Sequence, residues 1–371
     1  MALDNEYVFM NDSRPVGKDR TGTGGSRRRS GAKRVTSIDV AAHAGVSQAT
    51  VARVFSSPDV VSPATRAKVE AAATELGYVP NAIARSLKSQ RTNIVGAVVP
   101  AFGEYWQRVI SEFSRQLASR GEQLLLFSFT STDNLDSVLQ SVAQYRVDGL
   151  ILASANFDRG RLAEMQSVPT PVVAFNQPAA AGVVASVSVD NETGMAAIAE
   201  HLLDLGVASV QYVGGDSTAS TDQIRYRGAA QALGAAGVAC PYLESGGFTY
   251  DHGYRIAGEI AARDSKPDAV MVAGDELALG VIDGLLDRGV RTPDDVLVTG
   301  FDGLPQAAWA GYDLTTLEQP TDVLVEQAID LLLGRRDGIT TDATDIVVPG
   351  RVRLGRTTKP TSPPDQEDSH G

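Results

Sequence analysis

The stretch GVSQATVARVF, residues 45–55, places hydrogen-bonding and apolar side chains at helical spacing. At about 100° per residue, with Gln48 set to zero, Val51 and Val54 fall near 300° and 240°, whereas Arg53 falls near 140°. Glutamine can pair with adenine and arginine with guanine, and a small alanine can touch a thymine methyl group. The pattern predicts a helix with one packing face and one face suited to base edges. The predicted base-facing residues are Gln48, Ala49 and Arg53.

Hydroxyl groups surround this face. Thr36, Ser47 and Thr50 are suited to phosphate oxygens, which fix the register of a protein on DNA without carrying sequence information. A helix, a three-residue turn that begins with Gly45, and a second helix form a helix-turn-helix unit, whose second helix enters the major groove. An ordinary helical hairpin gives the same local pattern, and this alternative stays open here.

Residues 36–78 are expected to form three short helices. The first is expected to stop at Gly45, Ser47 to cap the second, and the third to run from the cap Ser62 to a stop at Gly77. The expected inward residues of the first helix are Ile38, Ala41 and Ala44.

From about residue 93 short apolar runs alternate with segments of helical length, which predicts parallel sheets covered on both faces. The set restarts after VSVDNETG, so we expect two similar α/β lobes with a ligand crevice between them, at the carboxyl ends of the strands. The expected strands are NIVGAVVP, EQLLLFSF, DGLILAS, TPVVAFN, ASVQYVGG, DAVMVAG and DVLVTGFD.

Between the helical part and the first strand lies YVPNAIARSLKSQRTNIVG. Leu87 sits there among the cations Arg85, Lys88 and Arg91 with nothing local to pack on. An apolar wedge flanked by cations suits insertion into the minor groove. Ordinary packing of a linker helix is the alternative.

The charge is distributed unevenly along the chain. The net charge is −12, yet residues 1–92 carry 14 Lys and Arg against 8 Asp and Glu, a net of +6, and the remainder carries 19 against 37, a net of −18. This asymmetry predicts a basic module attached to an acidic body. The cations of residues 27–34 contribute much of the excess, so a merely solvated basic tail is the alternative.

Several motifs, in this order, resemble the lactose/galactose-repressor family of bacterial transcription factors over about residues 35–356. They are VTSIDVAAHAGVSQATVARVF, VVSPATRAKVEAAATELGYVPNAIARSLKSQRTNIVGAVVP, VDNETGMAAIAEHLLDLG, RYRGAAQAL, VAGDELALGVIDGLLDRGVRTPDDVLVTGFDG and LTTLEQP. The resemblance implies a homodimer, with a tetramer left open, that binds double-stranded operator DNA. It also implies hinge helices at about residues 81–88 that become ordered on DNA. The body would have two Rossmann-like lobes of periplasmic-binding-protein type and sense a small effector.

The sequence departs from the family pattern at three places. Ala49 and Ala52 stand where many members carry larger or hydroxylated residues, so operator bases cannot be transferred from a relative. PAFGEYW at residues 100–106 replaces a pattern like PDISNPFF, and GD at residues 274–275 replaces ND and removes an amide that often touches the ligand. The residues expected to contact DNA are Thr36, Ser37, Ser47, Gln48, Ala49, Thr50, Arg53, Tyr78, Asn81, Ala84, Leu87 and Lys88.

The resemblance also implies an effector site. Arg225 matches the family's effector-binding arginine, whose planar guanidinium suits vicinal hydroxyls or a carboxylate; a surface arginine paired with Asp222 is the alternative. Asp302 matches the ligand aspartate, or is a turn residue. Asp275 either reaches the cleft or caps a helix.

Aromatic and amide residues complete the expected effector site. Phe248 matches an aromatic residue that stacks on the ligand, with ordinary packing as the alternative. Tyr105 and Trp106 are expected to form the opposing wall, although Trp106 could equally belong to the core. Gln319 lies where the chain recrosses between lobes and could contact the ligand or serve the hinge. His201 is interpreted as structural.

No catalytic or metal constellation is recognisable in the sequence. The histidines His43, His201, His252 and His370 lack metal-ligand spacing. Neither a G-x-S-x-G elbow nor a phosphate loop is present, and the adjacent carboxylates at residues 275 and 276 diverge at a helix start. We therefore expect no enzyme, cofactor or metal. The single Cys240 excludes an intrachain disulfide and a cysteine-based metal cage. An N-terminus without a signal-peptide core and the lack of a long apolar run lead us to expect a cytoplasmic protein without membrane association.

Two other functions compete with a ligand-controlled, operator-binding regulator, which is expected to be a repressor with a sugar or sugar derivative as effector. A transporter's solute-binding protein shares the two-lobed body but needs a signal peptide and has no use for residues 35–92. A nicotinamide-dependent enzyme needs a strand–GxGxxG–helix unit, which GAVVPAF cannot replace. The expected organisation is a basic tail over 1–34, a helix-turn-helix domain over 35–79, a linker over 80–92, a two-lobed domain over 93–356 and a polar tail over 357–371.

Overall fold

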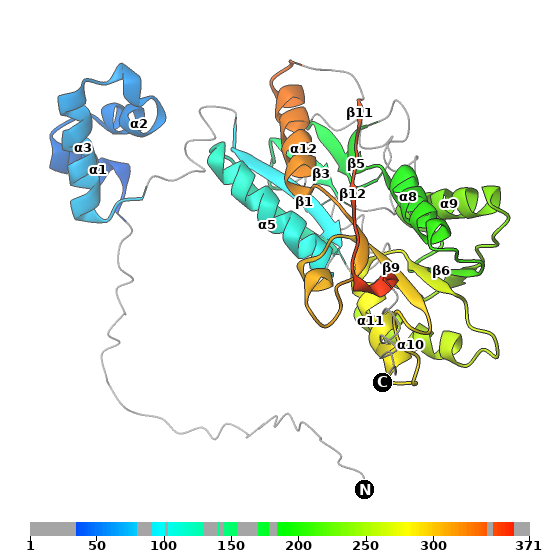
Figure 1. Ribbon diagram of the computed structural model, residues 1–371. Helices are drawn as coiled ribbons and strands as arrows, with labels where there is room; N and C mark the ends of the chain where they lie inside the picture. Colours follow the sequence, from blue (N-terminus) through cyan, green and yellow to red (C-terminus); the bar gives the residue numbers. More distant parts are fainter. Residues whose placement is uncertain are drawn as a thin grey trace, which may run out of the picture. The chain divides into compact units, whose positions relative to one another are not determined.

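The chain forms two compact units, residues 1–81 and residues 82–371. Residues 35–79 of the first make up the helical unit, and the described residues of the second make up the two-lobed unit. In the computed structural model the described residues are 35–79, 91–100, 103–129, 140, 142, 144–153, 170–177, 184–339 and 344–359 (Figure 1).

The helical unit packs three α-helices around a small apolar core (Figure 1). Its elements are α1 (Ser37–Ala44), α2 (Gln48–Ser56), a 3₁₀ turn (Pro58–Val60) and α3 (Pro63–Leu76). Each helix contributes small or β-branched residues, so the three backbones approach closely. The buried residues are Val40, Ala41, Ala44, Val51, Val54, Val69, Ala72 and Ala73.

Side-chain caps and glycines set the helix ends, as the sequence predicts. The Ser47 side chain accepts a hydrogen bond from the Thr50 amide at 3.1 Å and satisfies an amide that α2 leaves free. Ser62 caps α3 in the same way. Gly45 and Gly77 end α1 and α3 with φ of +63°, a left-handed conformation that glycine adopts without steric cost.

The prediction for one core residue is wrong. Ile38 is 62% exposed, and Val40 is fully buried in its place. A reciprocal cap between Thr36 and Asp39 starts α1 at Ser37. The inward stripe then follows Val40 and its neighbours, and Ile38 lies about 110° from the centre of that stripe.

The two-lobed unit contains two six-stranded sheets. The strand order is β11-β5-β4-β3-β1-β2 in the first lobe and β12-β10-β9-β8-β6-β7 in the second. The pairing is parallel throughout, except for the antiparallel pair β10–β12. The strands are β1 (Ile94–Pro100), β2 (Gln123–Phe129), β3 (Gly149–Leu152), β4 (Val172–Phe175), β5 (Ala185–Val189), β6 (Val210–Gly214), β7 (Tyr242–Glu244), β8 (Ala269–Val272), β9 (Leu297–Asp302), β10 (Thr315–Glu318), β11 (Asp345–Val348) and β12 (Arg351–Arg353).

All seven predicted strands are present, as β1, β2, β3, β4, β6, β8 and β9, and the two-lobe prediction is confirmed. Strands β5, β7, β10, β11 and β12 were not predicted because they are short or mix apolar with polar residues. The β10 sequence TTLE is an example, since Thr315 and Thr316 are completely buried although they are polar.

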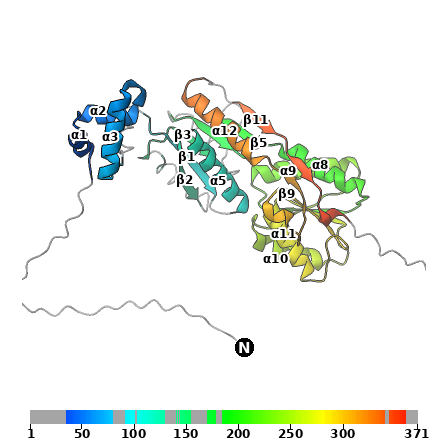
Figure 2. The ribbon, with the colours of Figure 1, turned by 60° about the vertical axis from the view of Figure 1, so that its left-hand side comes forward.

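Helices cover the sheets of both lobes (Figure 2). In the second lobe α10 and α11 lie in close contact, because an added Cβ at Gly253 or Gly280 would come within 2.0 Å of a carbonyl oxygen of the other helix. Among the described residues, the helices with defined bounds are α5 (Glu104–Ser119) and α12 (Thr321–Arg336) in the first lobe, and α8 (Asn191–Asp204), α9 (Ser220–Ala235), α10 (Tyr250–Ala261) and α11 (Asp275–Leu286) in the second.

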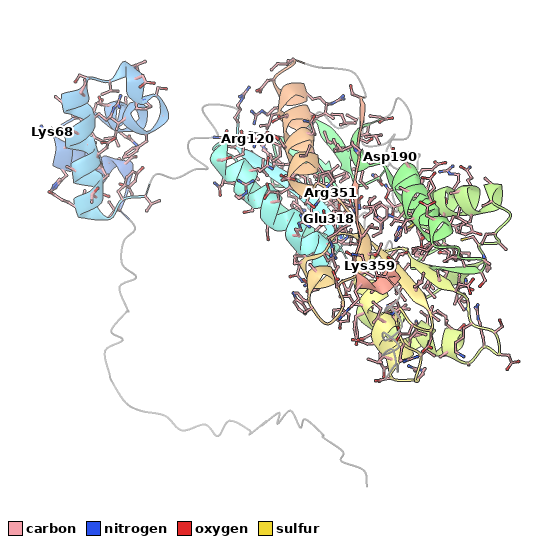
Figure 3. The ribbon with its side chains drawn as sticks, viewed as in Figure 1. Lys68, Arg120, Asp190, Glu318, Arg351 and Lys359 are labelled. Atoms are coloured by element: carbon pink, nitrogen blue, oxygen red, sulfur yellow. The ribbon has the colours of Figure 1, made fainter. Side chains whose placement is uncertain are left out.

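The described elements of the chain cross between the lobes three times: between β5 and α8, between β10 and α12, and between β11 and β12. The Asp190 side chain caps α8 at the first crossing by accepting from the Thr193 amide at 3.0 Å. Beside the second and third crossings, an ion pair of 2.6 Å between Arg351 and Glu318 joins β12 to β10. These two side chains lie close together in Figure 3. The ends of several strands are thereby gathered where the lobes meet.

Candidate functional site

The exposed face of α2 has the composition that the sequence predicts. Gln48, Ala49 and Arg53 are exposed, whereas Val51 and Val54 are buried against the other two helices. Donor groups and a small methyl group therefore face solvent from one side of a single, well-packed helix. Such a surface can enter a groove without rearrangement of the core.

Several of the predicted contact side chains also have partners inside the helical unit. The Gln48 amide nitrogen donates to the Ser37 hydroxyl at 3.0 Å, which fixes the direction of the glutamine. The hydroxyls of Thr36 and Ser47 serve as helix caps, and each remains on an exposed residue. The half-buried Tyr78 packs its ring on Phe55 with 6.0 Å between ring centres.

The helical unit itself is not basic. Residues 35–79 carry three Lys and Arg, at positions 53, 66 and 68, against four Asp and Glu, a net of −1. The positive excess of residues 1–92 thus belongs to the flanking segments 1–34 and 80–92. Of the remaining DNA-contact predictions, Asn81, Ala84, Leu87 and Lys88 lie outside the described residues.

A cavity of about 320 Å³ lies where the two lobes meet. Pro100 at the end of β1, Asn176 just after β4 and Asp302 at the end of β9 line it, together with the residues after β6, β7 and β8. The carboxyl ends of parallel strands from both sheets thus converge on one space, as predicted from the strand pattern.

Arg225 on α9 is 5% exposed and reaches the wall of this cavity. Its Nε donates to Oδ1 of Asn191 at 2.8 Å and its Nη1 to the carbonyl of Ala273 at 2.5 Å, while Nη2 lies 3.4 Å from Oδ1 of Asp302. The guanidinium also stacks over the Phe301 ring at 3.8 Å. The partner of Arg225 is therefore Asp302, and the alternative of a surface arginine paired with Asp222 is wrong.

Asp222 has another role. It is buried, and its carboxylate accepts hydrogen bonds from the hydroxyls of Tyr212 and Tyr242 and from the amides of Gly215 and Asp216. Burial raises the pKa of this carboxyl, and the hydrogen bonds from Tyr212, Tyr242 and the Asp216 amide, together with the Arg225 charge, oppose that effect. Asp222 thus holds the loop that presents Asp216 to the cavity.

Asp302 is an acceptor in the wall of the cavity. Its φ of +117° is rare for a residue with a side chain and costs backbone energy, which is typical of functional positions. The Gln319 amide donates to Oδ1 of Asp302 at 2.7 Å and accepts from the Tyr105 hydroxyl at 3.0 Å. Burial raises the pKa of Asp302, and the Arg225 charge opposes that effect.

Asp275 and Gln319 do not belong to the described lining of the cavity, contrary to expectation. Asp275 is completely buried and accepts from the Leu304 amide at 2.7 Å and the Thr316 hydroxyl at 2.6 Å. It supports the loop after β9, and it is neither a cleft residue nor the cap of α11. Burial, followed by the Asp302 charge, raises its pKa.

The glycine that replaces an asparagine of the family pattern lies beside Asp302. A Cβ at Gly274 would be 3.2 Å from Oδ2 of Asp302, so the glycine leaves space for that carboxylate. The departure at positions 274–275 therefore removes a possible ligand contact and leaves more space in the cavity beside Asp302.

Aromatic rings face the cavity from both lobes. Phe248 lies in the second lobe and is 38% exposed; Trp106 lies in the first and contacts Tyr105 and Phe175 edge-on. Trp106 thus belongs both to the wall and to the edge of the core. Tyr105 is 7% exposed and lines the same space.

One rim of the cavity is joined by hydrogen bonds between the lobes. The Glu104 amide at the start of α5 donates to Oε2 of Glu276 at 3.1 Å, and Arg108 donates to the Gly303 carbonyl at 3.0 Å. Gln306 donates to the Glu104 carboxylate at 2.9 Å. The relative position of the lobes is therefore tied to groups that line the cavity.

Five polar lining residues were missed from the sequence: Asn176, Asp216, Thr221, Thr249 and Glu276. Asn176 follows the predicted strand TPVVAFN directly, so its position at a carboxyl strand end was a usable signal. Asp216 follows β6 in the same manner. Glu276 could not be found in that way, because its side chain reaches the cavity from the first turn of α11.

His201, interpreted as structural, forms a hydrogen bond of 2.9 Å with the Thr358 hydroxyl, in agreement with that interpretation. Within the described residues, no three His, Cys, Asp or Glu side chains gather as a metal site. None of the described helices is long and apolar enough to cross a membrane.

Comparison with known proteins gives two family matches. The model for bacterial regulatory proteins of the lacI family matches residues 37–81, and the model for a periplasmic binding protein-like domain matches residues 199–358. The first match covers the three helices of the helical unit, and the second covers most of the second lobe together with α12.

Similar proteins span nearly the whole chain. Catabolite control protein A of Priestia megaterium is 31% identical over 331 residues, which are 88% of this chain and 99% of the relative. The ribose operon repressor of Escherichia coli strain K12 is 31% identical over 81% of this chain and 92% of its own. The solved complex of the transcriptional regulator CelR with cellobiose is 30% identical, covers 87% of this chain and 100% of its own, and superimposes with a TM-score of 0.66.

Proposed function

The chain belongs to the lacI family of bacterial regulatory proteins and is a DNA-binding transcription regulator, and from this premise we propose that it is a repressor controlled by a sugar. The observation that carries the proposal is the exposed face of α2, where Gln48, Ala49 and Arg53 stand opposite two buried valines. This helix would lie in the major groove of operator DNA.

On the DNA side, the side chains divide into two groups. Arg53 and Gln48 carry donors that suit guanine and adenine, and Ala49 suits a thymine methyl group. The hydroxyls of Ser47 and Thr50 lie at the amino end of α2, where phosphate groups are favourably bound. Leu87 in the linker would act as a minor-groove wedge.

Each chain carries one such reading helix, which suggests a homodimer on a roughly palindromic operator. With a single helix the base contacts cover one half-site. Two copies related by a twofold axis would read both half-sites and so add a second set of base contacts, and for this reason we propose a dimer and leave a tetramer open.

The proposed effector is a sugar or sugar derivative bound in the cavity between the lobes. Arg225 and Asp302 offer a donor and an acceptor from one wall, and the rings of Trp106 and Phe248 offer apolar faces from the two lobes. Two relatives are named for sugars, one as a ribose operon repressor and one solved with cellobiose. A sugar ring has an apolar face and many hydroxyl groups, and it therefore suits such a site.

The proposed mechanism is a shift between two lobe arrangements. An effector that contacts both lobes binds one arrangement more tightly and so changes its population. The linker leads directly into β1 of the first lobe, so movement of this lobe would change how the two linkers of a dimer meet DNA. Catalysis is not part of the proposal, and the bacterial cytoplasm is the proposed location.

The test of the proposal is operator selection from random DNA, followed by binding measurements with Arg53→Ala. We expect the variant to lose about 10- to 100-fold in affinity and to relax its preference at one base pair per half-site, equivalent to ~1–3 kcal/mol. Arg115→Ala, an exposed cation on α5 with 67% of its side chain accessible, is the matched control and should bind as the wild type does.

An equal loss on every DNA sequence would make Arg53 a phosphate contact. Failure of the wild-type chain to select any sequence would refute the repressor proposal. Leu87→Ala is expected to weaken operator binding and to reduce DNA bending without a change in effector affinity, and unchanged bending would return Leu87 to ordinary packing.

A further inference from the structure

The described residues that line the cavity carry unequal charge. Arg225 is their single cation, whereas Asp216, Glu276 and Asp302 are acids, so the lining has a formal charge of −2. The Arg225 charge is, moreover, matched by Asp302 at 3.4 Å. The carboxylates of Asp216 and Glu276 therefore remain without a cation in the lining.

The guanidinium of Arg225 has few donors left for an anion. Three of its five N–H groups point to Asn191, Ala273 and Asp302, and its face rests on the Phe301 ring. A carboxylate or phosphate is bound strongly when it receives the bidentate fork of an arginine. Here the fork is directed at the protein's own groups, and at most two N–H groups remain for a ligand hydroxyl.

The acceptors of the cavity, in contrast, are available. Asn176 is 8% exposed, and its side-chain oxygen is buried with no hydrogen-bond partner among the described residues. Oδ1 of Asp216 accepts from the amide and hydroxyl of Thr218, and Oε2 of Glu276 accepts from the Glu104 amide. Both carboxylates keep further acceptor capacity. An unsatisfied buried acceptor calls for a donor from the ligand.

From these observations we infer that the cavity selects a neutral or amine-bearing polyol and rejects the phosphorylated and carboxylated forms of the same sugar. The inference rests on the proposed sugar effector and narrows its chemical class. A polyol hydroxyl donates to Asn176, Asp216, Glu276 or Asp302, and an ammonium group adds a favourable charge. A phosphate or carboxylate has no proton to give and places a like charge beside the acids, which suppresses binding.

The test uses the full chain in a phosphate-free buffer near pH 7.5. Ribose, glucose, galactose and cellobiose are screened by thermal shift and titration calorimetry, next to the phosphate ester, the acid and the 2-amino form of each sugar where these exist. We expect the phosphate ester and the acid of the sugar that binds to be at least about 100-fold weaker than the sugar itself. The amino form should bind at least as tightly as the neutral sugar.

Two variants test the cause. Glu276→Gln and Asp216→Asn keep an acceptor oxygen and remove the charge, so each should narrow the gap between sugar and sugar phosphate by about tenfold. Glu259→Gln, an exposed acid on α10 away from the cavity, is the control and should leave the gap unchanged. Melting temperatures of the unliganded variants show that each one folds.

Binding of a sugar phosphate or acid as tightly as the neutral sugar would overturn the inference. So would a gap that neither variant changes, or a panel in which no neutral or amino sugar binds. Operator binding is measured in parallel: a phosphorylated effector that changes operator affinity would refute the charge inference and leave the repressor proposal standing. A chain that prefers neutral sugars and selects no operator would give the reverse result.

Discussion

The helical unit and the two-lobed unit present their candidate contact groups in opposite ways. On α2 the groups lie on the outside of one helix, and Gln48 and Arg53 are exposed. In the cavity Arg225 is buried and Asp302 is half-buried, and they come from separate elements, α9 and the end of β9. The first arrangement is local in the chain, whereas the second joins residues far apart in the sequence and exists only when the second lobe has folded.

This difference determines what each site can tolerate. A change on the exposed surface of α2 removes one contact and leaves the core of the unit intact, because the core is made by the buried valines and not by the exposed contact residues. A change in the cavity leaves a buried charge or amide without its partner, which costs more than the contact itself. The contrast between an independent surface and an interlinked cavity can be tested by substitution at both places.

The largest effect is expected in the cavity. Replacing Arg225 or Asp302 by Ala should abolish the effector's influence on operator affinity, a loss of at least about 100-fold in effector binding, because each change leaves ligand hydroxyls without partners at ~1–3 kcal/mol apiece. Basal operator binding should stay intact. Operator affinity with and without effector, for the wild type and both variants, is the measurement. A response at wild-type effector concentrations in both variants would move the site elsewhere.

The next prediction tests whether DNA attraction resides outside the helical unit, whose net charge is −1. Replacing the five Lys and Arg of residues 27–34 by Gln should weaken specific and non-specific DNA binding alike and lower the salt dependence of binding. The slope should fall by about 0.9 for every phosphate that the variant no longer neutralises. If the logarithm of the binding constant falls with the logarithm of the salt concentration as steeply in the variant as in the wild type, the alternative of a solvated tail is supported. Replacing five exposed cations of the two-lobed unit is the control.

A third prediction concerns pH. Burial raises the pKa of Asp275 above its ordinary value near 4, so the folded chain binds this proton more tightly than the unfolded chain. Its contribution to stability is therefore present at low pH and lost as the pH rises through the folded pKa. Between pH 5 and pH 8 the free energy of unfolding should decrease less in Asp275→Asn than in the wild type. Urea unfolding at a series of pH values measures this difference. The exposed Asp251→Asn is the control, and an equally steep decline in Asp275→Asn would contradict the argument.

The smallest effect is expected for a helix cap. Ser47→Ala removes the acceptor for the Thr50 amide and should lower the stability of α2 by about 1 kcal/mol. Hydrogen exchange of the α2 amides in the full chain measures this change, and Ser56→Ala at the other end of α2 is the control. Exchange that is equally fast in both variants would show that the cap does not hold the helix.

The sequence predicts the helical unit and most strands because their signals are local. The caps Ser47 and Ser62 and the stops Gly45 and Gly77 each act within a few residues, and apolar runs mark the central strands. Strands such as β10 escape prediction, since TTLE is polar and becomes buried only through its neighbours in the sheet. Ile38 was misplaced because a cap outside the helix decides where its inward stripe begins.

The site was predicted in part for the same reason. Arg225, Asp302 and Phe248 follow from motifs and lie at the cavity. The positions of Asp275 and Gln319 depend on residues far apart in the chain. Asp275 accepts from the loop after β9, and Gln319 joins Tyr105 to Asp302. No spacing in the sequence encodes such contacts.

The three crossings between lobes also affect how the chain folds during synthesis. The edge strand β11 pairs with β5, Ile346 lying opposite Val187, and β12 pairs with β10. The ribosome therefore releases β1 to β5 long before the strand that covers the free edge of β5 exists. An uncovered edge strand is a template for pairing with another chain. Nascent chains that stall before residue 345 should thus aggregate through β5, whereas full-length chains close that edge within their own fold.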